Sequence, residues 1–350
     1  MAAILVQGSV KAAKILTGLF LHPALAASAL LFLEYGSPTA VSRLIELGLA
    51  KHVGIHRLKV ALRVLLGLGL GRALNRVQNL RASNHWSLAS RGGWRWAEEI
   101  AVVTGGCHGI GKATVLGLVQ KGVRVAVLDV ADLPPDLVRL PTVFHWKCDI
   151  TSPDAVHDAA DQIRDRLGHP SILINNAGLA HYDSILDLPP AKLDRLFAVN
   201  ALSHWHTVRA FLPTMVLRDK GHIVTVASVA SFVALPQAVD YSASKAAALA
   251  FHEGLACEIR NVYRSPGVLT TVVHPSFVNT NMTAPAKQRI EARSGPMLEP
   301  RDVADAIVKQ IGSRRGAQLI VPPSSAWLSG LRGFPNWLQE TVRDMAAKGA

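Results

Sequence analysis

Apolar and polar positions follow a regular alternation over most of this 350-residue chain. From residue 98 onward, short runs rich in Val, Ile and Leu alternate with longer stretches in which apolar residues recur every three or four positions. Short continuous apolar runs are typical of strands buried on both faces, and the longer period is typical of amphipathic helices. The alternation therefore predicts an α/β fold with a doubly wound parallel sheet.

The pattern gives bounds for each predicted element. Strands are expected at Ile100–Thr104, Val123–Leu128, Val143–Trp146, Ile172–Asn175, His222–Ala227, Val268–His274 and Gln318–Val321. Helices are expected at Ile110–Lys121, Pro153–Leu167, Ala191–Leu217, Tyr241–Tyr263 and Arg301–Gly312. These elements define a predicted domain over residues 98–325, and residues 326–350 are expected to form a C-terminal helical tail.

The N-terminal part has a different pattern. Ile15–Leu33 carries no formal charge, and as a helix it would span about 28 Å, close to the thickness of one bilayer core. Pro23 favours a kinked or hairpin anchor over a straight helix. Val60–Leu74 is apolar but contains two arginines, which favours an interfacial segment. We therefore expect residues 1–74 to be a hydrophobic membrane-anchoring region and residues 75–97 to be a basic, aromatic linker.

Two other interpretations of the apolar run stay open. Lys11 and Lys14, followed by the small residues around Ala26, also fit a signal peptide, although the run continues to Leu33. A buried helix of a soluble protein is the second interpretation. Basic residues after the run outnumber the two before it, which favours a cytosolic side for the rest of the chain. They are Arg43, Lys51, Arg57 and Lys59.

The positive charge is concentrated in the same N-terminal quarter. Residues 1–97 contain 12 Lys/Arg and 2 Asp/Glu, whereas residues 98–350 contain 25 and 23. Because apolar runs separate the basic residues, this surplus favours an anionic membrane surface over nucleic acid. A hydrophobic content of 49% and a mean hydropathy of +0.24 exclude a mainly disordered chain. The three scattered cysteines indicate a reducing compartment and no zinc site.

A glycine-rich loop follows the first predicted strand. Its glycines allow a sharp turn and the close approach of a pyrophosphate to a helix N-terminus. Asp129, at the end of the next strand, can accept hydrogen bonds from adenosine ribose hydroxyls and would repel a 2′-phosphate, so NAD is favoured and NADP stays open. Cys107 could have a lowered pKa beside the helix N-terminus, although a packed thiol also fits. The candidate cofactor-binding residues here are Thr104, Gly105, Cys107, His108, Gly109, Ile110, Gly111 and Asp129.

At this point the chain resembles the short-chain dehydrogenase/reductase family over about residues 98–325. Further motifs carry the resemblance: Asp149-Ile150, Asn175-Asn176-Ala177-Gly178, and Pro275-Ser276-Phe277-Val278-Asn279-Thr280. The resemblance implies a Rossmann-type fold and additional cofactor-binding residues. These are Asp149 and Ile150 near the adenine, Asn176, Ala177 and Gly178 beside the cofactor, and Pro275, Val278 and Thr280 near the nicotinamide carboxamide. Ser276 stands where the family has glycine.

The predicted catalytic residues are Asn200, Ser228, Tyr241 and Lys245. Tyr241 and Lys245 are four residues apart and share one face of a helix. Hydride transfer needs an acid/base that titrates near neutrality, and the Lys245 ammonium together with a positive nicotinamide ring would lower the tyrosine pKa from about 10. The resemblance implies that Ser228 hydrogen-bonds the substrate oxygen and that Asn200 holds a water in the proton relay. Tyr241 and Lys245 are also expected to contact the cofactor.

Fourteen histidines raise the question of a metal, but His204 and His206 would point to different helix faces, so we expect none. The arrangement resembles the membrane-associated retinol dehydrogenase and 17β-hydroxysteroid dehydrogenase group. It implies an NAD(P)-dependent enzyme at the endoplasmic reticulum or a lipid droplet that interconverts a lipophilic alcohol and its ketone or aldehyde, and it is compatible with a homodimer. A soluble reductase of small polar carbonyls and a non-catalytic cofactor-binding membrane scaffold are the alternatives. Residues that select the substrate are expected in Gly178–Asp187 and Asn279–Pro300.

Overall fold

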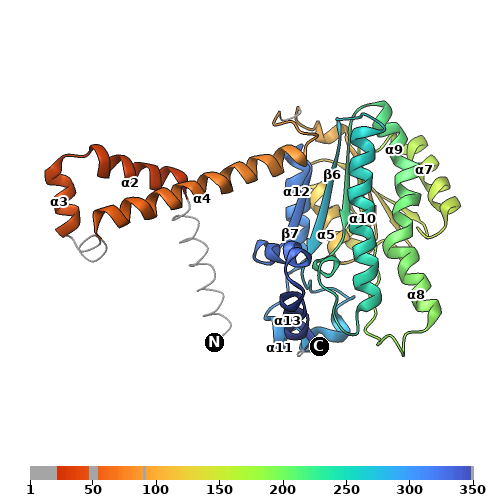
Figure 1. The fold of residues 1–350 in the computed structure, drawn as a ribbon. Coiled ribbons are helices and arrows are strands. Elements are labelled where there is room, and N and C mark those ends of the chain that lie inside the picture. Colours follow the sequence, from red (N-terminus) through yellow and green to blue (C-terminus); the bar gives the residue numbers. More distant parts are fainter. Residues whose placement is uncertain (1–21, 47–53, 90–91, 348–350) are drawn as a thin grey trace. The chain divides into compact units, whose positions relative to one another are not determined.

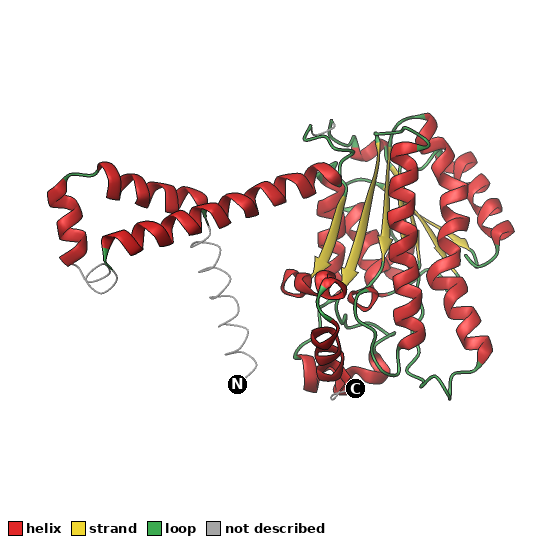
Figure 2. Ribbon diagram, in the orientation of Figure 1, coloured by secondary structure: helices red, strands yellow, loops and turns green. Residues whose placement is uncertain are grey.

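The computed structural model describes residues 22–46, 54–89 and 92–347. The chain divides into two compact units, Met1–Ala82 and Ser83–Ala350. Figure 1 labels their elements and Figure 2 separates helices from strands. In the first unit the described elements are α2 (Pro23–Tyr35), α3 (Pro38–Glu46) and α4 (Ile55–Ala82).

The first unit differs from its predicted form in two ways. Pro23 does not kink a helix but begins α2, because a proline at the first helical position loses no hydrogen bond and already has a helical φ angle. The second apolar stretch is part of one 28-residue helix, α4, which continues through residues 75–82 of the predicted linker. An ion pair of 2.8 Å between Arg63 and Glu34 joins α4 to α2.

The structure bears only in part on the predicted membrane span. Residues 15–21 of Ile15–Leu33 lie outside the described residues, and the remainder falls in α2, which has 13 residues. Within the described ranges, no helix combines the length and the apolar character that crossing a bilayer requires.

The second unit contains a seven-stranded parallel sheet, which confirms the predicted Rossmann-type α/β fold. Its order is β3-β2-β1-β4-β5-β6-β7. The strands are β1 (Ile100–Thr104), β2 (Arg124–Asp129), β3 (Val143–Lys147), β4 (Ile172–Asn175), β5 (Gly221–Val226), β6 (Val268–Pro275) and β7 (Ala317–Val321). The strand order reverses direction between β1 and β4, and in such sheets ligands bind beyond the carboxyl ends of the strands at this point.

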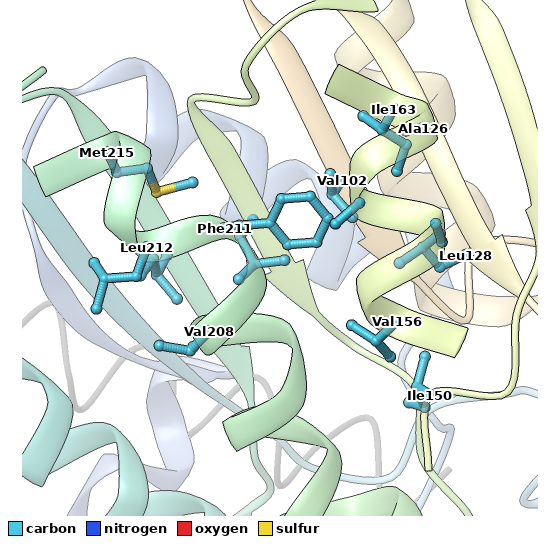
Figure 3. Close-up of a cluster of buried hydrophobic side chains, with 14 of the residues drawn as sticks. Val102, Ala126, Leu128, Ile150, Val156, Ile163, Val208, Phe211, Leu212 and Met215 are labelled. Atoms are coloured by element: carbon cyan, nitrogen blue, oxygen red, sulfur yellow. The ribbon is translucent and has the colours of Figure 1, made fainter. Parts of the chain in front are cut away.

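Helices cover both faces of the sheet (Figure 1). The larger ones are α5 (Gly109–Val119), α7 (Pro153–Leu167), α9 (Ser203–Leu217), α10 (Val239–Asn261) and α12 (Pro300–Gly312). Because successive side chains of a strand point to opposite faces, Val102 of β1 packs with α7 and α9, whereas Val103 packs with α5 and α12. Figure 3 shows Phe211 of α9 in the first of these cores, with Val156 and Ile163 of α7.

The predicted helix Ala191–Leu217 is divided into three segments. α8 (Pro190–Phe197) leads into a π-helical turn, η2 (Ala198–Leu202), and α9 follows. The π turn contains Asn200, which is buried together with its neighbours Val199 and Ala201. Short π turns inside helices occur frequently at functional sites because they change the direction in which a side chain points. The expected C-terminal tail contains the 3-10 segment η5 (Pro323–Gly333) and α13 (Asn336–Ala347).

Candidate active site

The glycine-rich loop between β1 and α5 has the backbone form that the sequence predicted. Gly105 and Gly109 have φ angles of +64° and +53°, in the left-handed region that favours glycine. A Cβ atom at Gly105 would lie 2.9 Å from Cα of Ala177, and one at Gly109 would lie 3.1 Å from Cγ2 of Thr280. The loop therefore packs closely against the segments that follow β4 and β6, and it leads into the N-terminus of α5.

The motif after β4 fastens this loop. The Thr104 hydroxyl accepts hydrogen bonds from the backbone N–H groups of Asn176 at 3.0 Å and Ala177 at 3.1 Å. In return, Nδ2 of Asn176 donates to the carbonyl oxygens of Thr104 at 3.0 Å and Gly105 at 3.1 Å. Four hydrogen bonds thus join the ends of β1 and β4 at the switch point of the sheet.

Asp129 lies beside the same loop. Its Oδ2 accepts from the Cys107 N–H at 2.9 Å, and its Oδ1 accepts from the Ala131 N–H at 3.0 Å. The Cys107 thiol is fully buried, and burial, followed by the Asp129 charge, raises its pKa to about 12. The lowered thiol pKa considered from the sequence is therefore wrong, because burial outweighs the helix N-terminus. His108, at the N-cap of α5, is exposed, whereas Ile110 and Gly111 belong to its first turn.

The residues expected near the adenine lie after β3. Asp149 accepts from the backbone and hydroxyl of Thr151 and from Arg195 at 3.0 Å. Burial raises the pKa of Asp149, but these hydrogen bonds outweigh burial and hold it below the usual value. Ile150 is buried in the core beside α7.

Tyr241, Lys245 and Ser228 converge at the carboxyl ends of β5 and β6. Tyr241 and Lys245 stand on α10, and Ser228 caps the short 3-10 turn η3 (Val229–Ser231) that follows β5. Nζ of Lys245 donates to the Val226 carbonyl at 2.9 Å and lies 5.8 Å from the centre of the Tyr241 ring. A hydrogen bond links Tyr241 to Ser228.

Asn200 is linked to this group through Gly178, which lies close to both Asn200 and Lys245. A Cβ atom at Gly178 would lie 3.4 Å from Oδ1 of Asn200 and 3.5 Å from Nζ of Lys245. The Asn200 amide accepts from the Leu179 N–H at 2.7 Å and donates to the Leu179 carbonyl at 2.8 Å and to the Ser244 hydroxyl at 3.0 Å. Sequence reasoning missed Ser244, which also donates to the Tyr241 carbonyl. Its position three residues after Tyr241, on the same helix face, was the available signal.

Burial controls the titration of these groups. It lowers the pKa of Lys245 to about 8 because an ammonium is poorly solvated there. Burial also raises the pKa of Tyr241, and the hydrogen bond with Ser228 offsets only part of that rise. The predicted lowering by Lys245 is therefore not produced by the chain's own side chains, because burial dominates and the ammonium donates to a backbone carbonyl instead.

The segment after β6 is ordered by its own hydrogen bonds. The Ser276 N–H donates to the Val321 carbonyl at 2.7 Å, so serine is accommodated where glycine was expected. The Thr283 hydroxyl accepts from the Thr280 N–H at 3.1 Å and donates to the Val278 carbonyl at 2.6 Å. The carbonyl of Pro275, at the end of β6, accepts a hydrogen bond from Ser228 at 3.5 Å, which places this segment next to Ser228.

His204 and His206 differ in environment, as their spacing predicts. His204 is buried in the core side of α9, whereas His206 is only partly buried. No group of three or more His, Cys, Asp or Glu side chains in the described residues could hold a metal ion.

Comparisons with known proteins agree with this geometry. The family model described as short chain dehydrogenase matches residues 99–291. Dehydrogenase RED2 of Cochliobolus heterostrophus is 39% identical over 211 residues, which cover 60% of this chain and 78% of that protein. Estradiol 17-beta-dehydrogenase 11 of Mus musculus is 32% identical over 235 residues, covering 65% and 76%. The structure of 3-ketoacyl-(acyl-carrier-protein) reductase from Brucella melitensis, complexed with NADH, shares the fold, with a TM-score of 0.57, 22% identity and coverage of 64% and 96%.

Proposed function

Because this chain belongs to the short-chain dehydrogenase family and is an oxidoreductase acting on CH–OH groups, we propose that it interconverts a lipophilic alcohol and its ketone or aldehyde with Tyr241 as the general acid/base. The observation that carries the proposal is the convergence of Tyr241 with the buried residues Lys245 and Ser228. The lipophilic substrate class is supported by the similarity to estradiol dehydrogenases.

The residues present fit a dinucleotide cofactor. Side chains at Gly105 and Gly109 would collide with neighbouring segments, so this loop keeps bare backbone at the N-terminus of α5, where phosphate groups bind favourably. Asp129 stands beside the loop as a hydrogen-bond acceptor for ribose hydroxyls. A bound nicotinamide would donate or accept the hydride.

The chain's own residues handle the proton. Ser228 hydrogen-bonds the substrate oxygen and holds it next to the Tyr241 hydroxyl. Tyr241 takes the proton from the alcohol during oxidation and returns it during reduction. Lys245, with a pKa of about 8, carries its charge at neutral pH and stabilises the phenolate when the phenol loses its proton. Asn200 orients the loop at Leu179 beside this group and supports a water in the relay.

Replacement of Tyr241 tests the chemistry. Tyr241→Phe removes only the hydroxyl, so we expect a loss of at least a thousandfold in kcat with NADH binding, followed by fluorescence, nearly unchanged. Tyr263→Phe is the matched control because that phenol is exposed and hydrogen-bonded to Glu258, and it should keep full activity. If Tyr241→Phe retains more than a tenth of the wild-type turnover with a panel of steroids, retinoids and long-chain alcohols, Tyr241 is not the acid/base.

We also propose NAD as the preferred cofactor, because the Asp129 carboxylate would repel a 2′-phosphate. Asp129→Asn removes the charge and keeps one oxygen acceptor for the Cys107 or Ala131 N–H. We expect the ratio of kcat/KM for NADPH to that for NADH to rise at least tenfold. A wild-type protein that already prefers NADPH would contradict this part of the proposal.

The N-terminal unit is proposed to attach the enzyme to a membrane or lipid-droplet surface on the cytosolic side. The support is the basic surplus before residue 98 and the exposed apolar side chains of α4, such as Leu68 and Leu74. The full-length chain should float with anionic vesicles even in high salt. Leu68→Glu with Leu74→Glu should weaken flotation, whereas Leu217→Glu, at an exposed site of the catalytic unit, should not. Flotation unaffected by the paired change would refute the assignment.

A further inference from the structure

The loop after β4 makes an ion pair that the proposed reaction does not use. Nδ1 of His181 lies 3.3 Å from Oδ2 of Asp240, which stands in the first turn of α10 directly before Tyr241. The Asp240 side chain is 3% exposed and that of His181 is 21% exposed. A buried carboxylate is unfavourable without a partner, and the helix N-terminus compensates only part of its desolvation. The contact with His181 therefore fixes this corner of the site.

The same loop is attached at several other points around Tyr241. Gly178 approaches Nζ of Lys245, and both backbone polar groups of Leu179 bond to Asn200. The Tyr182 hydroxyl donates to the Met282 carbonyl at 3.2 Å, which joins the loop to the segment after β6. Burial is the largest cause that raises the pKa of Tyr241, and Tyr182 adds a smaller contribution in the same direction. The two phenols are therefore within electrostatic reach of each other. The loop is thus attached near Lys245, at Asn200 and at the segment after β6.

We propose that His181 is a positioning residue: its contact with Asp240 holds the loop 178–187 against the first turn of α10 and so sets the shape of the substrate pocket beside Tyr241. The proposal rests on the proposed function, because it assigns His181 to the pocket of that reaction. Loss of the contact frees the short stretch around His181, between the attachments at Leu179 and Tyr182. Substrate binding should therefore suffer more than the chemical step.

Charged and titratable groups surround His181 on several elements. Asp240 is in direct contact, and the loop itself carries Tyr182 and Asp183, which pairs with Lys192 of α8 at 3.0 Å. Arg289 of α11 (Lys287–Ser294) is near enough to Tyr182 to lower the Tyr182 pKa, although burial raises that pKa by more.

The test compares His181→Ala with His181→Asn, whose Nδ2 can replace Nδ1 as a donor to Asp240. With NAD and the alcohol that reacts fastest among estradiol, retinol and 1-dodecanol, His181→Ala should raise KM at least tenfold and change kcat less than threefold. His181→Asn should restore KM to within threefold. Lys192→Ala breaks the other ion pair of this loop and should leave KM unchanged. An unchanged KM in His181→Ala, or an equal rise in His181→Asn, would overturn the proposal.

Amide hydrogen exchange of the full-length protein gives a measurement that is independent of turnover. Exchange of residues 179–187 should accelerate at least threefold in His181→Ala, and in His181→Asn it should stay at the wild-type rate. If Tyr241→Phe is inactive but the loop exchanges equally in all variants, the proposed function stands and the role of His181 is wrong. If Tyr241→Phe is active, the proposed function is wrong, and the exchange result still decides whether His181 holds the loop.

Discussion

Four histidines lie in the interior of the catalytic unit, and we predict that they make its stability sensitive to mild acid. They are His204, His222, His252 and His274, all of which are at most 5% exposed. His222 forms a hydrogen bond of 2.8 Å with the Thr271 hydroxyl, and His252 forms one of 3.0 Å with the Thr225 hydroxyl. His274 forms one of 2.9 Å with the Ser228 carbonyl. Burial, as the largest cause, lowers the pKa of the first three to about 3 and that of His274 to about 4.

The direction in which pH changes the free energy of unfolding follows from proton uptake. These folded-state pKa values lie below the usual histidine value of about 6.5, so between about pH 4 and 6.5 the unfolded chain binds more protons than the folded one. The free energy of unfolding therefore falls as the pH drops below 6.5. From pH 7 to pH 5.5 each histidine should cost about 1 kcal/mol, and the four together about 4–5 kcal/mol. Because a typical domain has a stability of about 5–15 kcal/mol, this is a large loss.

Urea unfolding of the full-length protein at pH 7.0, 6.5, 6.0 and 5.5 measures the effect. His252→Gln can keep a hydrogen bond to Thr225 and should reduce the pH dependence by about a quarter, whatever its effect on stability at pH 7. His157→Gln is the control, because that side chain is exposed. A wild-type stability that changes by less than about 1 kcal/mol between pH 7 and 5.5 would show that the interior histidines accept protons in the folded state.

Three further predictions concern the ends of the sheet. Asn176→Ala removes two hydrogen bonds from the β1 end, so it should cost about 1–3 kcal/mol in urea unfolding and weaken NADH binding, whereas Asn261→Ala, at an exposed helix end, should do neither. Gly109→Ala forces an unfavourable positive φ and should weaken NADH binding, measured by fluorescence, at least tenfold. Lys220→Ala leaves the buried Glu99 carboxylate without its ion-pair partner and should lower the free energy of unfolding by about 3 kcal/mol. Glu99→Gln should cost less, as judged by urea midpoints, and the reverse order would contradict this reasoning.

The sheet was predictable because its strands are buried on both faces. All seven strands lie within a residue or two of the predicted bounds, and helix Pro153–Leu167 matches at both ends. The start of that helix is marked locally, since Ser152 caps it by accepting from the Ala155 N–H at 3.2 Å. Burial and capping both depend on residues close together in the chain, which explains why a single sequence sufficed.

Other features depend on hydrogen-bond geometry or environment, which an apolar pattern does not record. The π turn Ala198–Leu202 keeps the apolar spacing of the helices around it, so the sequence predicted one continuous helix. The end of α4 at Ala82 was missed because its last two turns are mostly polar and exposed. Burial is the largest cause of the raised pKa of Tyr241, whereas the prediction also relied on a positive nicotinamide ring, which is not one of the chain's own groups.

The candidate site also contains both kinds of feature, some that follow from local sequence and some that do not. Tyr241 and Lys245 are one helical turn apart, so their proximity follows from a single element and is visible in the sequence. His181 and Asp240 are 59 residues apart and meet only because a loop crosses to the start of α10. The aspartate directly before Tyr241 is the local signal that could have drawn attention to the pair. The proximity of Tyr241 and Lys245, the proposed proton-transfer residues, is therefore fixed by a shared helix, whereas His181 and Asp240, the proposed pocket-shaping pair, come from separate segments. Under these proposals, substitutions at such pairs should change KM before they change kcat.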